Sequence, residues 1–212
     1  MTALRLIVYD RTCTRWGVGL STAWAAGARL YHRLDRHDAA YGATSWADAL
    51  AWIASYEPSR SIAEVQYWGH GKWGRVLAGD DRLDRATFEG AHARAFASIR
   101  ERLLPDGGSL LWLRTCEAFG GDAGHDFARC LADGLGARVA GHTFIIGVLQ
   151  SGLRTLAPGM RPAWRATEGI AEGTPAKPLR AHESSALSPR TVHCLTNVVP
   201  RTWLAEDGVA QP

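Results

Sequence analysis

The feature that most constrains the fold is a repeated alternation of short apolar runs with longer stretches of helical periodicity. Four runs read as strands, and they cover residues 4–10, 62–68, 109–116 and 137–147. Four stretches place apolar residues at helical spacing and read as helices, over residues 20–34, 44–57, 86–104 and 124–136. Apolar strands that alternate with helices are typical of a mainly parallel sheet covered on both faces. We therefore predict an α/β fold with a mainly parallel central sheet and helices on both faces.

The pattern fades beyond residue 152, and the chain is expected to divide there into two parts. Its 212 residues, 46% hydrophobic and 21% charged, suit one α/β domain. We assign that domain to residues 1–170. Residues 171–212 carry Pro175, Pro178 and Pro189 among small polar residues. They are predicted to form an irregular C-terminal extension.

Charge and hydropathy limit the classes of partner. The net charge is only +3, and the arginines alternate with acidic residues, so we expect no nucleic-acid partner. No run reaches the roughly 20 apolar residues that span a bilayer, so no membrane partner is expected. Residues 1–10 lack the pattern of a secretory signal, which favours a cytoplasmic location.

The stretch "VQYWGHGKWGRVLAGD" has two possible interpretations. Gly69, Gly71 and Gly74 spell the G-x-G-x-x-G pattern of dinucleotide-binding loops. That chemistry needs a helix directly after the glycines, because the helix N-terminus binds the pyrophosphate. Residues 75–80 instead look like a strand and a turn. The alternative is that His70 stands at the end of a buried strand.

A cysteine follows the next predicted strand and completes a possible nucleophile–base pair. Cys116 ends the run 109–116, and carboxyl ends of neighbouring parallel strands lie on one edge of a sheet, so His70 and Cys116 face one crevice if their two strands are adjacent. Imidazole can take the proton of a thiol, and the thiolate is the nucleophile. The N–H groups of Gly71 and Cys116 would then form an oxyanion hole. We expect no cofactor and no metal site.

These segments together, "EVQYWGHGKWGRVLAGDDRL" and "SLLWLRTCEAFGGDAGHDFARCLADGLGARVAGHTFIIG", resemble the caspase-like cysteine peptidase superfamily. The similarity is greatest to an uncharacterised bacterial branch with a strand ending in His-Gly and a later strand ending in Cys. It covers residues 62–147, and more loosely 4–169. The resemblance implies a three-layer caspase-like sandwich and a cysteine endopeptidase with a His70–Cys116 dyad, acting on a peptide or protein. The caspase signature Q-A-C-[RQG]-G is replaced by "RTCEAFGG", so no preference for aspartate carries over.

Three further residues are candidates for a substrate groove. Trp68 and Trp73 flank the histidine and could shape such a groove. Asp122 lies in the small-residue loop after the cysteine and could attract a basic substrate side chain. A core role is the alternative for both tryptophans.

The other cysteines are expected to be thiols, since none is in a C-x-x-C spacing. Cys130 lies in a helical pattern and Cys194 in the extension, so both are expected to be structural. Cys13 follows the first strand and is either a resolving thiol or a loop residue, with the loop residue favoured.

Two other functions stay open. One is a non-catalytic interaction domain that keeps the caspase-like fold, in which case Cys116 would be unreactive. The other is a serine hydrolase, although the chain has no G-x-S-x-G elbow.

Overall fold

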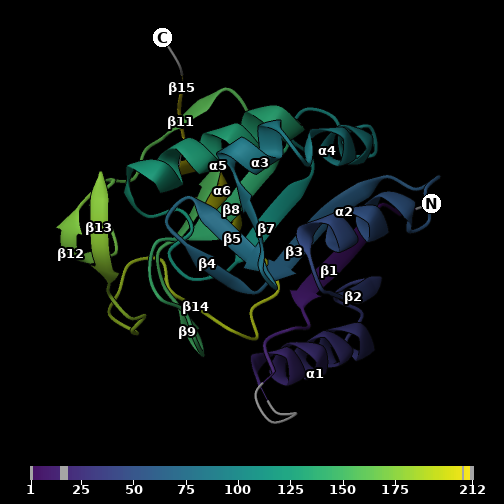
Figure 1. Cartoon of the computed structure of the whole chain (residues 1–212), viewed down its shortest axis with the longest axis horizontal. Coiled ribbons are helices and arrows are strands. Elements are labelled where there is room, and N and C mark those ends of the chain that lie inside the picture. Colours follow the sequence, from purple (N-terminus) through teal and green to yellow (C-terminus); the bar gives the residue numbers. More distant parts are fainter. Residues whose placement is uncertain (1, 15–18, 207, 211–212) are drawn as a thin grey trace.

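A six-stranded sheet in the order β2-β1-β3-β7-β8-β10 forms the centre of the protein (Figure 1). The computed structural model describes residues 2–14, 19–206 and 208–210. The strands of this sheet are β1 (Leu4–Asp10), β2 (Ala39–Ala43), β3 (Ile62–Trp68), β7 (Leu110–Arg114), β8 (Arg138–His142) and β10 (Leu153–Leu156). All neighbours are parallel except β10, which pairs with β8 antiparallel. The prediction of an α/β fold with a mainly parallel sheet is confirmed.

Helices cover both faces of the sheet because alternate strand residues point to opposite sides. In β1, Leu6 and Val8 belong to the large core on one face, and Ile7 belongs to a second cluster beneath α1. Figure 1 places α2 to α5 on one side and α1 on the other. The helices are α1 (Leu20–Arg33), α2 (Trp46–Ser55), α3 (Arg85–Glu89), α4 (Ala93–Arg100), α5 (Gly121–Leu135) and α6 (Arg201–Glu206).

Local sequence signals explain where several helices begin and end. The Ser45 hydroxyl accepts a hydrogen bond from the Asp48 amide and caps α2. Gly136 ends α5 in the left-handed conformation, with φ 63°. The single long helix predicted over 86–104 is wrong. Glycine is a poor residue for a helix interior, and the chain breaks at Gly90 into α3 and α4.

Between β3 and α3 the chain forms a small antiparallel sheet of three strands, β4 (His70–Lys72), β5 (Arg75–Ala78) and β6 (Asp81–Asp84). A strand, not a helix, therefore follows the glycines of the G-x-G-x-x-G pattern. That pattern consequently lacks the helix N-terminus on which a dinucleotide site depends.

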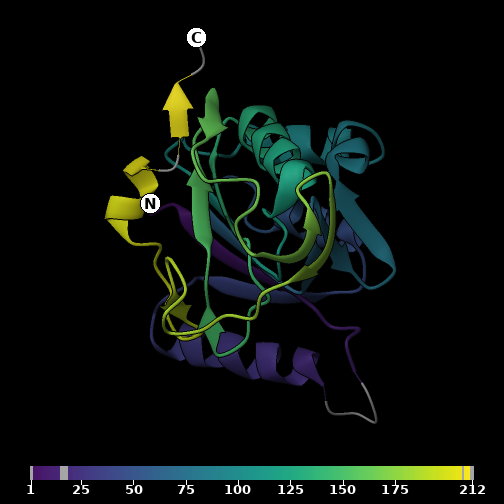
Figure 2. The ribbon, with the colours of Figure 1, turned by 90° about the vertical axis from the view of Figure 1, so that its left-hand side faces the viewer.

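The remaining strands are short: β9 (Leu149–Gln150), β11 (Met160–Pro162), β12 (Ile170–Thr174), β13 (Lys177–Ala181), β14 (Val192–His193) and β15 (Gly208–Ala210). Figure 2 shows the C-terminal segment, in yellow, running along one side of the molecule. There Trp203 and Leu204 pack against a cluster that contains Trp112 and Leu153. The division at residue 170 stays a prediction.

The buried guanidinium of Arg114 joins this segment to the sheet. It donates to the carbonyls of Cys194 and Thr196 at 2.7 and 3.0 Å, and to the Gln150 side chain at 2.9 Å. Arg114 is only 5% exposed. A charge-assisted network of this kind compensates the cost of burying the guanidinium.

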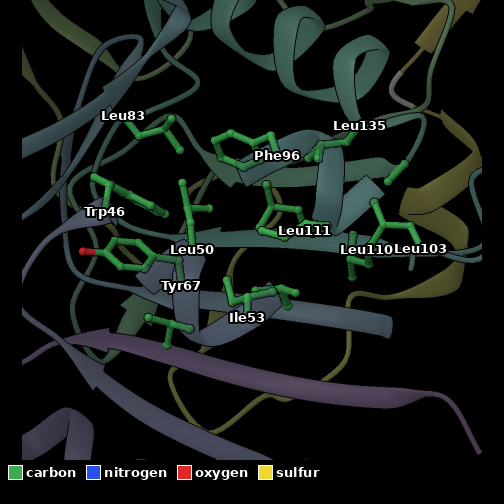
Figure 3. Close-up of a pocket in the computed structure, with 14 residues that line it drawn as sticks. Trp46, Leu50, Ile53, Tyr67, Leu83, Phe96, Leu103, Leu110, Leu111 and Leu135 are labelled. Carbon is green, nitrogen blue, oxygen red and sulfur yellow. The ribbon is translucent and has the colours of Figure 1, made fainter. Parts of the chain in front are cut away.

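The interior between α2, α4, α5 and the sheet contains one small apolar cavity of about 30 Å³ (Figure 3). Leu50, Tyr67, Phe96 and Leu111 are among its lining residues. Its size and its apolar walls are those of a packing defect in the core and not of a ligand site. Among the described helices, none is long and apolar enough to cross a membrane.

Candidate active site

The loops that follow three neighbouring parallel strands meet at one edge of the central sheet. β3 pairs with β1 on one side and with β7 on the other. The loop after β1 carries Cys13, the chain after β3 carries His70, and the loop after β7 carries Cys116. His70 therefore follows the middle strand, with a thiol on the strand end to either side. Open α/β sheets place ligand sites at such carboxyl ends.

The His70 imidazole contacts the thiol of Cys13, for which the sequence leaves open a resolving role or a loop role. The distance from His70 Nε2 to Cys13 Sγ is 3.1 Å. The ring also meets the edge of Trp24, with 5.8 Å between ring centroids. Within the part of the chain that the structure describes, the hydrogen-bonding contact of this ring is with Cys13 and not with Cys116. His70 is exposed, so its ring has room to turn.

The carboxylate of Asp10 fixes the loop that carries Cys13. Asp10 Oδ1 accepts hydrogen bonds of 2.7 Å from both the amide and the hydroxyl of Thr12. Its other oxygen accepts from the amide of Gly79, in the turn between β5 and β6, at 3.3 Å. The buried side chain of Asp10 thus connects the end of β1 to the small sheet that begins with His70.

Gly71 lies too close to the loop after β7 for any larger residue. A Cβ at this position would be 2.5 Å from Thr115 Oγ1 and 2.7 Å from the carbonyl oxygen of Cys116. The amide of Gly74 also donates to the carbonyl of Ala118 at 2.9 Å. These two contacts fix the histidine-bearing strand against the cysteine-bearing loop. The requirement for glycine here comes from close approach of two backbone segments.

The thiol of Cys116 is half-buried, and its surroundings favour the neutral thiol over the thiolate. Burial raises its pKa most, and the nearby charge of Glu117 raises it further. Cys116 Sγ lies 3.9 Å from the carbonyl oxygen of Ile146. This weak hydrogen bond lowers the pKa of the thiol and partly offsets the effect of burial. A base or a change of environment is needed to produce the thiolate.

Glu117 is an unusual residue in this loop. Its φ of 27° lies in the left-handed region, which is costly for a residue with a side chain, and its amide donates to the carbonyl of Phe144 at 2.9 Å. The residue is 7% exposed, and its Oε2 has no hydrogen-bond partner among the described residues. Burial raises the pKa of Glu117 to about 7, although the charge of Lys72 acts against this.

The three residues predicted for a substrate groove have different environments. Trp68 is 7% exposed and packs edge-on against Tyr31 beneath α1, so its ring belongs to the core and not to a groove. Trp73 is half-buried beside the loop after β7, and the Lys72 ammonium lies 5.0 Å from its ring centroid. Asp122 is exposed near the start of α5. Trp73 therefore lies beside the loop after β7, next to Gly120, whereas the role of Asp122 in a groove stays a prediction.

Metal ligands do not gather at this edge. The described residues contain no group of three or more His, Cys, Asp or Glu side chains placed to hold a metal ion. His142 is fully buried, and its imidazole is engaged with the Ser151 carbonyl at 3.0 Å. Burial lowers the pKa of His142 to about 3, which keeps the ring neutral.

Sequence reasoning missed two features of the site. Cys13 follows a strand in the sequence, which signals its position at this edge, but the sequence does not predict its contact with His70. Glu117 is the second feature, and its only signal in the sequence is an acidic residue directly after the cysteine in "RTCEAFGG". Burial and backbone strain at Glu117 arise only from the folded loop.

A family described as "Domain of unknown function (DUF4347)" matches residues 25–153 of the chain, which is more than half of its length. The matched region includes His70 and Cys116 and begins after Cys13. Comparison with curated proteins finds no match.

Proposed function

We propose that this chain, which belongs to the family described as "Domain of unknown function (DUF4347)", is a cysteine peptidase of the caspase-like kind. Cys116 is the nucleophile and His70 is the base. The substrate is a peptide or a protein, and the reaction requires no cofactor. The observation that carries the proposal is the clamp between Gly71 and the backbone of Thr115 and Cys116, which holds the histidine strand against the cysteine loop.

The order of elements supports the caspase-like assignment. A buried parallel strand ends just before His70, a glycine-turn hairpin follows, and the adjacent parallel strand leads to Cys116. This succession is the one on which the resemblance in the sequence rests. The helices on both faces of the sheet agree with a three-layer sandwich.

The proposed reaction passes through a thioester. His70 accepts the Cys116 proton, and the sulfur attacks the carbonyl carbon of the scissile peptide bond. The N–H groups of Gly71 and Cys116 bind the oxyanion. Collapse of the intermediate breaks the C–N bond, and His70 protonates the leaving amine. Water then hydrolyses the thioester and releases the carboxylic acid and the thiol.

The contact between His70 and Cys13 has a consequence for this mechanism. Because Nε2 faces Cys13 at 3.1 Å, the exposed ring must turn, or use Nδ1, to accept a proton from Cys116. The resting arrangement is therefore not yet the reactive one. Apo sites commonly tighten their hydrogen bonds only when substrate binds.

A second candidate function is supported by the same observations. The thiol of Cys116 has a raised pKa, and the ring nitrogen faces another cysteine. Both properties suit an interaction domain that keeps the caspase-like fold without catalysis. Such a domain would tolerate Cys116→Ala with no loss of partner binding.

Covalent trapping tests the peptidase proposal. We would incubate the protein with a library of peptidyl acyloxymethyl ketones and locate the adduct by mass spectrometry. The variants are Cys116→Ala, His70→Ala, Cys13→Ala and, as a matched thiol control on α5, Cys130→Ala. We expect an adduct on Cys116 that is lost in Cys116→Ala, slowed in His70→Ala, and retained in the other two variants.

Two outcomes would refute this assignment. An adduct that disappears in Cys13→Ala and persists in Cys116→Ala would make Cys13 the nucleophile. Complete absence of labelling at Cys116 across the library would favour the interaction domain.

A further inference from the structure

A surface pocket of about 430 Å³ lies between α1 and the edge of the central sheet. α1 packs against β1 and β2, and β2 is the edge strand (Figure 1). The wall of the pocket consists of residues of α1, two residues of β2, Tyr9 of β1 and His37 of the connection between α1 and β2. The volume lies in the range of small-molecule sites. The pocket is separate from the candidate active site, since neither His70 nor Cys116 lines it.

His37 is a deeply buried polar residue of this wall. It is 3% exposed, and neither of its ring nitrogens has a hydrogen-bond partner among the residues that the structure describes. Burial, together with the charge of His32, lowers the pKa of His37 to about 4, so the ring is neutral at neutral pH and carries one N–H donor. Buried polar groups are normally paired. A ligand with a hydrogen-bond acceptor would supply the partner that this N–H lacks.

The charged residues of the wall are all basic among the described residues that line it. Arg29, His32 and Arg33 lie on α1 and are exposed. Neither guanidinium makes an ion pair or a hydrogen bond with a residue that the structure describes. Arg29 and Arg33 are four residues apart, so they lie on one face of the helix, where two like charges repel each other. A bound anion would offset this repulsion.

The two acidic residues of the connection between α1 and β2 interact with a different arginine. Asp38 accepts a hydrogen bond of 2.7 Å from the amide of Arg5, and the same carboxylate oxygen lies 3.6 Å from Arg5 Nε. The Asp35 carboxylate lies 3.8 Å from the Arg5 guanidinium. Asp35 and Asp38 therefore leave the positive charges of Arg29 and Arg33 uncompensated.

We propose that this pocket binds a small organic phosphomonoester, with its phosphate between Arg29, Arg33 and His37. A phosphate group close to the dianion at neutral pH matches two guanidinium groups in charge, and its oxygens accept hydrogen bonds from arginine and imidazole alike. The alanines of α1 and β2 and the ring of Tyr9 supply apolar surface for the organic part of the ligand. This inference is independent of the peptidase proposal, because it concerns a different place in the fold.

Calorimetric titration of the full chain tests the proposal. The probes are phenyl phosphate, ribose 5-phosphate, inorganic phosphate and benzoate, and the proteins are wild type, Arg29→Gln, Arg33→Gln, Arg94→Gln and Cys116→Ala. Arg94 is an exposed arginine on α4 and serves as the matched charge control, and Cys116→Ala detects binding at the candidate active site. We expect at least one of the two organic phosphates to bind wild type with a Kd of about 1 mM or tighter, and more tightly than inorganic phosphate or benzoate.

Arg29→Gln and Arg33→Gln should each weaken this binding by about tenfold, the loss that corresponds to one charge-assisted hydrogen bond. Arg94→Gln and Cys116→Ala should bind as wild type. The inference is overturned if neither organic phosphate binds, if inorganic phosphate or benzoate binds as tightly, or if Arg94→Gln has the same effect as the α1 variants. Loss of binding in Cys116→Ala would place the probe at the active site and overturn it as well. No arm requires peptide hydrolysis, so failure here leaves the peptidase proposal intact.

Vesicles distinguish a dissolved ligand from a membrane lipid. Phosphatidic acid carries a phosphomonoester headgroup, so the comparison is sedimentation of the protein with phosphatidylcholine vesicles that contain or lack it. We expect no sedimentation with either, because His37 is too deeply buried to meet a headgroup held in a bilayer. Sedimentation that requires phosphatidic acid, and that is lost in Arg29→Gln, would overturn the assignment to a small dissolved molecule.

Discussion

Replacing Glu117 with glutamine should stabilise the protein at neutral and alkaline pH but not at acidic pH. The carboxyl is 7% exposed, and burial raises its pKa to about 7 from an ordinary 4.5. Below pH 4.5 the group is protonated in both the folded and the unfolded chain, so the carboxyl and the amide differ little. Glutamine has the same length and the same backbone requirement at φ 27°, so strain cancels in the comparison.

The magnitude follows from proton linkage. Between pH 4.5 and 7 the unfolded chain loses the proton while the folded chain keeps it, so the unfolding free energy falls as pH rises. Each pH unit costs about 1.36 kcal/mol, which sums to about 3 kcal/mol above pH 7. Glutamine does not titrate, so the unfolding free energy of the variant does not fall in this way as pH rises. We therefore expect Glu117→Gln to be more stable than wild type by about 3 kcal/mol at pH 8 and by almost nothing at pH 4.5.

Urea unfolding followed by tryptophan fluorescence at intervals from pH 4.5 to 8 measures this difference. The midpoint of the variant should exceed that of wild type by about 1 M or more at pH 8. His37 and His142, whose pKa values are lowered by burial to about 4 and about 3, destabilise both proteins as pH falls below 6.5. Their effect cancels in the comparison. A difference that stays flat with pH, or a variant less stable than wild type at pH 8, would mean that the folded protein accommodates ionised Glu117 and would refute the reasoning.

Two further changes test how the site is assembled. Gly71→Ala should destabilise the protein by about 1–3 kcal/mol and abolish Cys116 labelling, because its Cβ would be 2.7 Å from a backbone carbonyl of the loop after β7. Gly147→Ala is the matched control, because a Cβ there would meet no atom within 4 Å. Equal thermal stability of the two variants would contradict the claim that Gly71 is required by close approach to the loop after β7. Arg114→Met should release the C-terminal segment from the sheet, with a loss of about 2 kcal/mol or more from its charge-assisted hydrogen bonds. Hydrogen exchange of residues 192–199 should then accelerate well beyond that of β8. Unchanged protection would show that the Arg114 guanidinium does not hold the C-terminal segment on the sheet.

Local sequence was sufficient to predict the position of a strand where the segment has a clear apolar pattern. β1 and β3 are short, apolar and followed by polar turns, so their positions and their parallel arrangement were predictable. The same pattern placed His70 and Cys116 after two predicted strands, and the pairing of β3 with β7 makes those strands neighbours. β2, with the sequence "AAYGA", was not predicted, because an edge strand of small, half-exposed residues lacks an apolar pattern.

Tertiary structure decided what the sequence left ambiguous. Arg114 looks like the polar residue that ends a strand, yet the C-terminal segment folds over it and makes it the buried tether. Segments distant in the chain are neighbours only in the folded sheet, where Cys13 Sγ lies 3.1 Å from His70 Nε2.

The sequence by itself determined the alternation of strands and helices, and with it the positions of His70 and Cys116 after two predicted strands. Those properties depend on local periodicity, which each segment carries alone. Tertiary structure alone decided which thiol faces the imidazole and how deeply the carboxylate of Glu117 is buried. Both depend on contacts among the loops that follow β1, β3 and β7. The local sequence of one loop does not specify its distance from the other two.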